Sequence, residues 1–211
     1  MSTSEPDATL VERLQSGDES AFEQLVDAHH RGMVKLAQTF VDDEATAEEV
    51  VQETWTAVID GLDRFEGRSS LKTWIFSILT NLARKRGKRD ARSLNWSSLS
   101  DGSIDREVSQ ESNRFNAEGH WSIPPPAWST DPEEELMRTK LLERVKEAID
   151  ELPERQKAVV QLRDVEGLSS SQVCEILDIT AGNQRVLLHR GRTKVRDSLE
   201  TYLADGKEVS R

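Results

Sequence analysis

Residues 164–196, which read DVEGLSSSQVCEILDITAGNQRVLLHRGRTKVR, constrain the fold more than any other part of the chain. Val173 and Ile176 recur at helical spacing behind Ser169, a residue type that caps helix N-termini. The residues 178–180, Asp-Ile-Thr, interrupt this period, and Thr180 can cap a following helix. That second helix carries the basic side chains of Arg185, His189, Arg190, Arg192, Lys194 and Arg196. The pattern predicts a helix-turn-helix whose second helix packs by one face and presents cations to a DNA major groove by the other.

The cations of this motif are a local feature, because the chain as a whole has a net charge of -11. Such an acidic chain binds a polyanion weakly, so DNA binding requires local basic patches or a larger partner. The single cysteine, Cys174, excludes an internal disulfide and fits a reducing compartment. The N-terminus lacks the apolar core of a signal peptide, and no apolar run approaches the roughly 20 residues that cross a bilayer. We therefore expect a cytoplasmic protein without membrane insertion.

Helical periodicity of apolar residues divides the chain into two blocks, residues 20–92 and residues 133–203, and no segment shows the two-residue period of a strand. The intervening residues, 93–132, are rich in Ser, Asn, Gly and Asp, which is typical of a flexible linker. The aromatic residues there fit either isolated positions in a tether or anchors that dock on a partner. We expect an all-α chain of two small helical domains joined by this flexible linker, with tails at residues 1–19 and 204–211.

Two charged segments lie in the first block. Residues 84–92, RKRGKRDAR, carry six cations and one anion, and Phe65 and Asn81 lie upstream of them. Cations bind phosphates and aromatic rings stack on unpaired bases, so the segment indicates contact with single-stranded or opening DNA. The alternative is a solvated basic tail on a helix whose Trp74 lies in the core, which is the position we expect for Trp74. Residues 42–53 carry six carboxylates and no cation. They form either a solvated helix face or a surface that docks on a basic protein.

Signals of enzymatic chemistry are missing from the sequence. It contains no glycine-rich phosphate loop and no Cys/His spacing that would hold zinc. His29 and His30 are adjacent, so on a helix they point to different faces and make a poor metal pair. We therefore expect a protein that is not an enzyme, with no catalytic residue, no metal site and no cofactor.

The order of these features resembles bacterial sigma factors of the extracytoplasmic function (ECF) group of the sigma-70 family. AEEVVQETW, residues 47–55, is similar to the helix by which that family docks on RNA polymerase. RFEGRSSLKTWIFSILTNLARKRGKR, residues 64–89, is similar to its melting and −10 recognition segment. ELPERQKAVVQLRDVEGLSSSQVCEIL, residues 151–177, resembles the start of sigma domain four. By this resemblance, residues 20–92 form sigma domain two and residues 133–203 form sigma domain four with its helix-turn-helix.

The resemblance also implies roles for three sets of residues. Those expected to dock on the β′ clamp helices of core RNA polymerase are Glu48, Glu49, Gln52 and Glu53. Those expected to contact the −10 element, in part as single strands, are Phe65, Arg68, Ser69, Asn81, Arg84, Lys85, Arg86, Lys88 and Arg89. Those expected to contact the −35 duplex are Asn183, Gln184, Arg185, His189, Arg190 and Arg192. Further implied partners are the β flap of the polymerase and an anti-sigma factor, and the chain is expected to be a monomer.

The predicted recognition helix departs from the pattern of the family. Many members read VGTVKSRLHRAR where this chain reads AGNQRVLLHRGR, so Gln184 replaces an apolar residue and Leu187 replaces a frequent cation. Gly191 should cost the helix up to about 1 kcal/mol relative to alanine. We therefore expect a slightly rotated helix in which Asn183 and Gln184 read base edges.

The function implied by the resemblance is promoter-specific transcription initiation for a stress or envelope regulon, with the polymerase supplying the catalysis. The main alternative is a conventional helix-turn-helix repressor or activator that binds duplex operators by itself, usually as a dimer. A second alternative is a nucleic-acid enzyme that uses the helix-turn-helix for targeting. It would need a clustered metal site, and the carboxylates of residues 42–53 lie beside no ligand motif.

Overall fold

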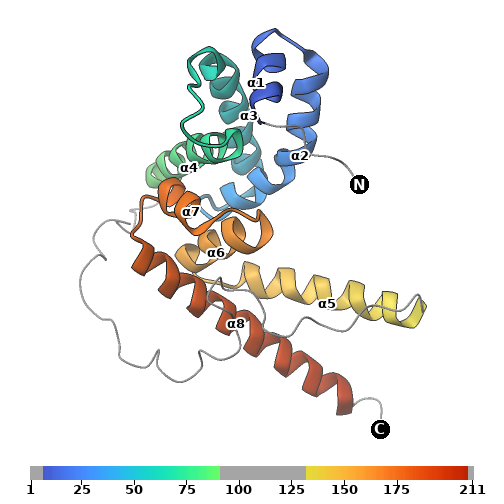
Figure 1. The fold of residues 1–211 in the computed structure, drawn as a ribbon. Helices are drawn as coiled ribbons and strands as arrows, with labels where there is room; N and C mark the ends of the chain where they lie inside the picture. Colours follow the sequence, from blue (N-terminus) through green and yellow to red (C-terminus); the bar gives the residue numbers. More distant parts are fainter. Residues whose placement is uncertain (1–6, 91–131, 209–211) are drawn as a thin grey trace. The chain divides into compact units, whose positions relative to one another are not determined.

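The computed structural model describes residues 7–90 and 132–208, and every regular element in these two ranges is a helix (Figure 1). This confirms the all-α class. Of the described residues, 7–90 and 147–208 belong to one compact unit, and 132–146, which are most of one helix, belong to another. The predicted linker, residues 93–132, lies outside the described residues apart from Pro132.

The N-terminal helices are α1 (Asp7–Gln15), α2 (Glu19–Ala37), α3 (Glu44–Gly61) and α4 (Leu71–Asp90), with a 3-10 turn, Leu62–Arg64, after α3. The tail expected at residues 1–19 thus contains a helix. In α1, Leu14 is buried and the Gln15 Nε2 donates a hydrogen bond to the Leu62 carbonyl at 3.0 Å. A helix this short is marginal by itself, so tertiary contacts stabilise it, and they are not visible in the local sequence.

Local side-chain caps begin the longer helices. The Asp18 carboxylate accepts the Ala21 N–H at 3.2 Å at the start of α2, and a hydrogen bond from Arg13 holds the pKa of Asp18 below its usual value. The Ser70 Oγ accepts the Thr73 N–H at 3.1 Å at the start of α4. These bonds satisfy N–H groups that the first turn of a helix leaves unpaired.

The core of the N-terminal part lies between α2, α3 and α4, which pack on one another. Its largest fully buried side chains are Met33, Leu36, Val50, Val51, Val58, Leu71, Ile75, Phe76 and Leu79. Their removal from water, at about 25 cal/mol for each Å² of apolar surface, is the main force that holds α3 and α4 side by side.

The C-terminal helices are α5 (Pro132–Asp150), α6 (Glu154–Val160), α7 (Ser170–Leu177) and α8 (Ala181–Glu208), and a π-helical segment, Gln161–Val165, continues α6. Helices α7 and α8 are the predicted helix-turn-helix. Ser169 and Gln172 form a reciprocal capping box at the start of α7, and Thr180 accepts the Asn183 N–H at 3.2 Å at the start of α8. Helix α8 runs to residue 208, so the backbone is helical through much of the tail predicted at residues 204–211.

Gly191 lies where α8 packs against α6. A Cβ at this position would lie 2.7 Å from the Val160 Cγ2, and Val160 is itself only 3% exposed. The glycine that breaks the family pattern therefore permits close approach of the two helices, and its cost in helix propensity is offset by packing.

We expect the Gly191→Ala variant to lose about 1 kcal/mol of unfolding free energy. Overpacking against Val160 costs about 1–3 kcal/mol and outweighs the roughly 1 kcal/mol that alanine adds in helix propensity. Urea denaturation followed by circular dichroism measures the change. The control is Gly182→Ala in the same helix, where no atom lies within 4 Å of the added Cβ. Stabilisation of both variants would contradict the packing role of Gly191.

Candidate functional site

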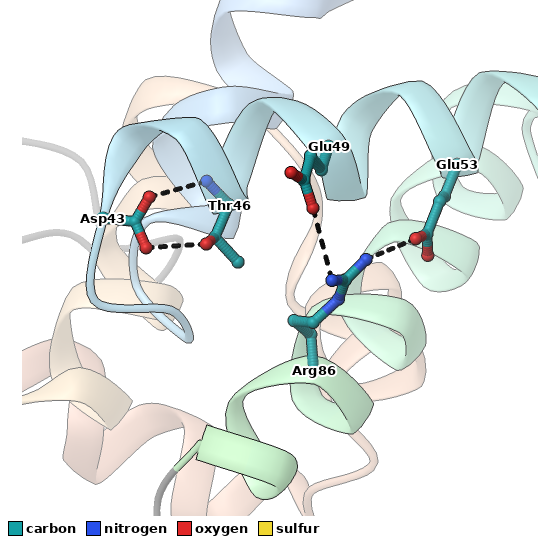
Figure 2. A network of polar contacts seen from close by, with 5 residues as sticks. All are labelled: Asp43, Thr46, Glu49, Glu53 and Arg86. Atoms are coloured by element: carbon teal, nitrogen blue, oxygen red, sulfur yellow. Dashed lines mark hydrogen bonds and ion pairs between the residues drawn. The ribbon is translucent and has the colours of Figure 1, made fainter.

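Helix α3 presents the four residues expected to dock on polymerase. Glu48, Glu49, Gln52 and Glu53 recur at one- and four-residue intervals, so they share one side of the helix. The helix begins at the cap Asp43, whose carboxylate accepts the Thr46 N–H at 2.8 Å and the Thr46 hydroxyl at 2.6 Å (Figure 2). These hydrogen bonds, the hydroxyl first, hold the pKa of Asp43 below its usual value. The start of the acidic helix is therefore held in place by an ionised carboxylate.

Arg86, on α4, lies between two of these carboxylates. Its Nη1 is 3.3 Å from the Glu49 Oε2 and its Nη2 pairs with the Glu53 Oε1, so one guanidinium serves two acidic side chains (Figure 2). The other carboxylate of the set, Glu48, lies 3.3 Å from the His30 Nε2 on α2. Gln52 is exposed. The acidic face is thus partly neutralised by Arg86 of the chain itself.

The loop before α4 holds the aromatic residue expected to reach a base. The Phe65 ring lies 5.0 Å, centroid to centroid, from the Trp74 ring, and both side chains are half-buried. Trp74 also lies against Gly61, where a Cβ would be 3.1 Å from the indole. Trp74 therefore supports Phe65 at the surface and is not an enclosed core residue. Arg68, in the same loop, is 85% exposed and pairs with Glu66 at 3.0 Å.

The remaining residues of the −10 set differ in exposure. Asn81 and Lys85 are exposed on α4, and Ser69 is half-buried. Arg84 is half-buried, donates from its Nη2 to the Leu177 carbonyl at 2.7 Å, and lies over the Phe40 ring. Burial lowers the pKa of the Arg84 guanidinium, and Asp178 and Glu154 partly offset this shift. The side chains of Lys88 and Arg89 lie outside the described part of the structure.

The exposed cations of the −35 set are Arg185 and Arg190, on α8. Asn183 and His189 are half-buried. Arg192 makes a two-bond ion pair with Asp164, at 2.9 Å from its Nε and 2.5 Å from its Nη2. This pair joins the middle of α8 to the segment before the helix-turn-helix, so Arg192 has a structural partner that its sequence position did not indicate.

The prediction that Gln184 reads base edges needs correction. Its side chain is 3% exposed, on the face of α8 that also buries Leu188 and Gly191. Residues 184, 188 and 191 follow the spacing of a buried helical stripe. The apolar residue usual in the family at this position was the signal that pointed to the core.

Comparison with known proteins shows the family and does not favour the repressor. The profile described as Sigma-70 region 2 matches residues 25–93, and the profile described as Sigma-70, region 4 matches residues 142–195. The chain belongs to the sigma-70 family of sigma factors, in its ECF group. Region 2 contains α3 and α4, and region 4 contains the helix-turn-helix.

The similarity to two other sigma factors covers nearly the whole chain. RNA polymerase sigma-H factor of Pseudomonas aeruginosa is 29% identical over 209 residues, which are 97% of this chain and 100% of that protein. The ECF RNA polymerase sigma-E factor of Escherichia coli K12 is 27% identical over 203 residues, 96% of this chain and 99% of that one.

Two solved structures are similar in fold, each at 20% sequence identity. CnrH in complex with the cytosolic domain of CnrY has a TM-score of 0.55 and covers 92% of this chain and 97% of its own. Bartonella quintana RpoE in complex with the anti-sigma factor NepR has a TM-score of 0.54 and covers 85% and 96%. Among the described helices of this sigma factor, none is both long and apolar enough to span a membrane.

Proposed function

We propose that this sigma factor binds core RNA polymerase and directs initiation at promoters through −10 and −35 recognition and DNA melting. The observation that carries the proposal is the pairing of an acidic helix face in region 2 with a helix-turn-helix in region 4 whose exposed cations are Arg185 and Arg190. An acidic face suits a basic protein surface, and a cationic recognition helix suits DNA.

Docking on core polymerase involves the shared face of α3. Glu48, Glu49, Gln52 and Glu53 contact the β′ clamp helices, and region 4 contacts the β flap. Because the net charge of -11 opposes binding to DNA, polymerase supplies the scaffold that holds both DNA-binding parts along one promoter. Two weak sites joined on one carrier gain affinity by effective concentration.

Promoter recognition is divided between the two regions. In region 2, Phe65, supported by Trp74, and exposed Asn81 capture unpaired bases of the −10 element, and Lys85 holds phosphate. In region 4, Arg185 and Arg190, with His189 and Asn183 beside them, read the −35 duplex. Capture of unpaired bases favours the melted promoter, and the polymerase carries out catalysis.

Regulation by an anti-sigma factor is a further part of the proposal. It is supported by the similarity in fold to a sigma factor solved with the anti-sigma factor NepR. The sigma factor acts as a monomer and serves a stress or envelope regulon. A pull-down from unstressed cells that recovers no stoichiometric inhibitor would count against this part.

Run-off transcription tests the function directly. Purified bacterial core polymerase, with and without this sigma factor, is given a library of promoters from the genome that encodes it. We expect start sites that appear only when the sigma factor is present, and their upstream sequences should share two elements. Absence of core binding and of new transcripts, together with tight binding of the isolated chain to duplex operators, would favour the repressor.

A further inference from the structure

We propose that Arg86 is a cation shared between polymerase docking and DNA binding. In the isolated chain it pairs with both Glu49 and Glu53, and docking of these carboxylates on polymerase transfers it to promoter phosphate. The transfer step rests on the proposed docking function of α3. The pairing itself is a property of the chain alone and can be tested without polymerase.

The geometry makes Arg86 a bridge between two sets of residues with different expected partners. Glu49 and Glu53 are four residues apart on α3, so both carboxylates face the same neighbour, and α4 packs along α3. The forked guanidinium presents one nitrogen to each carboxylate (Figure 2). With two negative charges around one positive charge, the group keeps a net negative charge that repels a phosphate.

The backbone of Arg86 is fixed, so exchange of partners must occur through its side chain. The next residue, Gly87, packs so closely on the Phe40 carbonyl oxygen that an added Cβ would overlap it. This contact holds the end of α4 against the turn between α2 and α3. The side chain of Arg86 is 27% exposed, whereas those of Glu49 and Glu53 are 62% and 51% exposed. Both carboxylates are therefore accessible to a partner, whereas the guanidinium of Arg86 is less exposed than either of them.

The ion pairs of Arg86 with Glu49 and Glu53 are weak enough for Arg86 to exchange these carboxylates for another partner. Ion pairs between partly exposed side chains contribute little stability, so a cationic surface on a partner can replace Arg86 at modest cost. One guanidinium cannot hold both carboxylates and a phosphate in the same geometry. Polymerase docking and phosphate binding by Arg86 therefore favour each other, and linkage requires this coupling to be equal in both directions.

Charge-neutralising variants of the isolated full-length chain test the pairing. The probe is a short fluorescein-labelled single-stranded DNA at low salt, and binding is read by anisotropy. We expect Glu49→Gln with Glu53→Gln to tighten binding about five-fold beyond the effect of charge alone, because Arg86 becomes available to phosphate. The effect of charge alone is measured with Glu44→Gln, which removes one exposed acidic residue from the same helix. Twice the change in binding free energy that this variant causes is the baseline for the loss of two charges.

A double-mutant cycle assigns the gain to Arg86. In an Arg86→Gln background, the extra tightening is expected to disappear and the charge baseline to remain. Lys85→Gln is the matched control, because Lys85 is an exposed cation one residue away. Its loss should weaken DNA binding equally in the chain with Glu49 and Glu53 and in the chain with both replaced by glutamine. Persistence of the extra tightening without Arg86, or no measurable DNA binding by the Glu49→Gln, Glu53→Gln chain, would overturn the proposal.

A second measurement tests the transfer. Arg86→Gln is expected to tighten binding of the sigma factor to core polymerase without DNA, about three-fold, because both carboxylates become available. The same variant should weaken promoter complexes. A purely structural role would weaken both, and that result would overturn the transfer. If the DNA cycle succeeds but run-off transcription yields no new start sites, the proposed function fails while the pairing stands.

Discussion

The Gly87→Ala variant is expected to lose about 3 kcal/mol of unfolding free energy, the largest loss for a single methyl group that we foresee in the N-terminal core. The added Cβ would overlap the Phe40 carbonyl oxygen, which is backbone and cannot rotate away. The turn around Phe40 is itself held, since the Phe40 N–H donates to the Ala37 carbonyl at 2.8 Å. Either α4 shifts or its end frays, and both outcomes weaken its packing on α3.

Denaturant unfolding, followed by circular dichroism, measures this loss. It is large relative to the roughly 5–15 kcal/mol by which small proteins are stable. Lys85→Ala, two residues earlier and exposed, is the control and should change the unfolding free energy by less than about 0.5 kcal/mol. Equal stability of the Gly87→Ala variant and the unmodified chain would show that the end of α4 does not pack on Phe40.

Replacement of both Arg185 and Arg190 by alanine is expected to reduce promoter-specific run-off transcription at least about 100-fold. Each contact between an arginine and a base edge contributes about 1–3 kcal/mol, so loss of two removes most of the −35 selectivity. Binding to core polymerase should be unchanged, which native gel shifts with core alone would measure. Promoter-specific transcription at the original level would place −35 recognition elsewhere on the chain.

Arg192 provides the contrast for that experiment. Because Arg192 is paired with Asp164, the Arg192→Ala variant should lower thermal stability and not only promoter selectivity. Comparison of the melting temperatures of the Arg185→Ala, Arg190→Ala and Arg192→Ala variants therefore separates cations that contact DNA from the one that supports the fold.

The sequence predicted features that depend on neighbouring residues. Caps such as Ser169 and Thr180 act within three residues of themselves, so their patterns identify the starts of α7 and α8. The buried face of α8 followed a helical period as well, and the expectation for Gln184 was wrong because residue polarity was given more weight than that period.

Features that depend on tertiary contacts could not be predicted in this way. Arg86 meets its carboxylates across 33 and 37 residues, and no local spacing joins them. Helix propensity alone predicted that Gly191 destabilises its helix. A glycine is required there because α8 packs closely on Val160 of another helix, and that contact is not visible in the local sequence. Helix α1 is stabilised by the Gln15 bond to the Leu62 carbonyl, 47 residues away, and so its pattern was not recognised.

The ion pair between Arg192 and Asp164 has a consequence for exchanging promoter specificity between sigma factors. A chimera made by grafting only α8 would carry one half of the pair into a host that lacks the other, or would leave Asp164 without its cation. The smallest transferable cassette therefore begins before Asp164 and extends beyond Arg192. Engineered sigma factors assembled with that boundary should remain folded. Those joined at the turn before α8 should lose the ion pair between Arg192 and Asp164, and with it stability, independently of DNA binding.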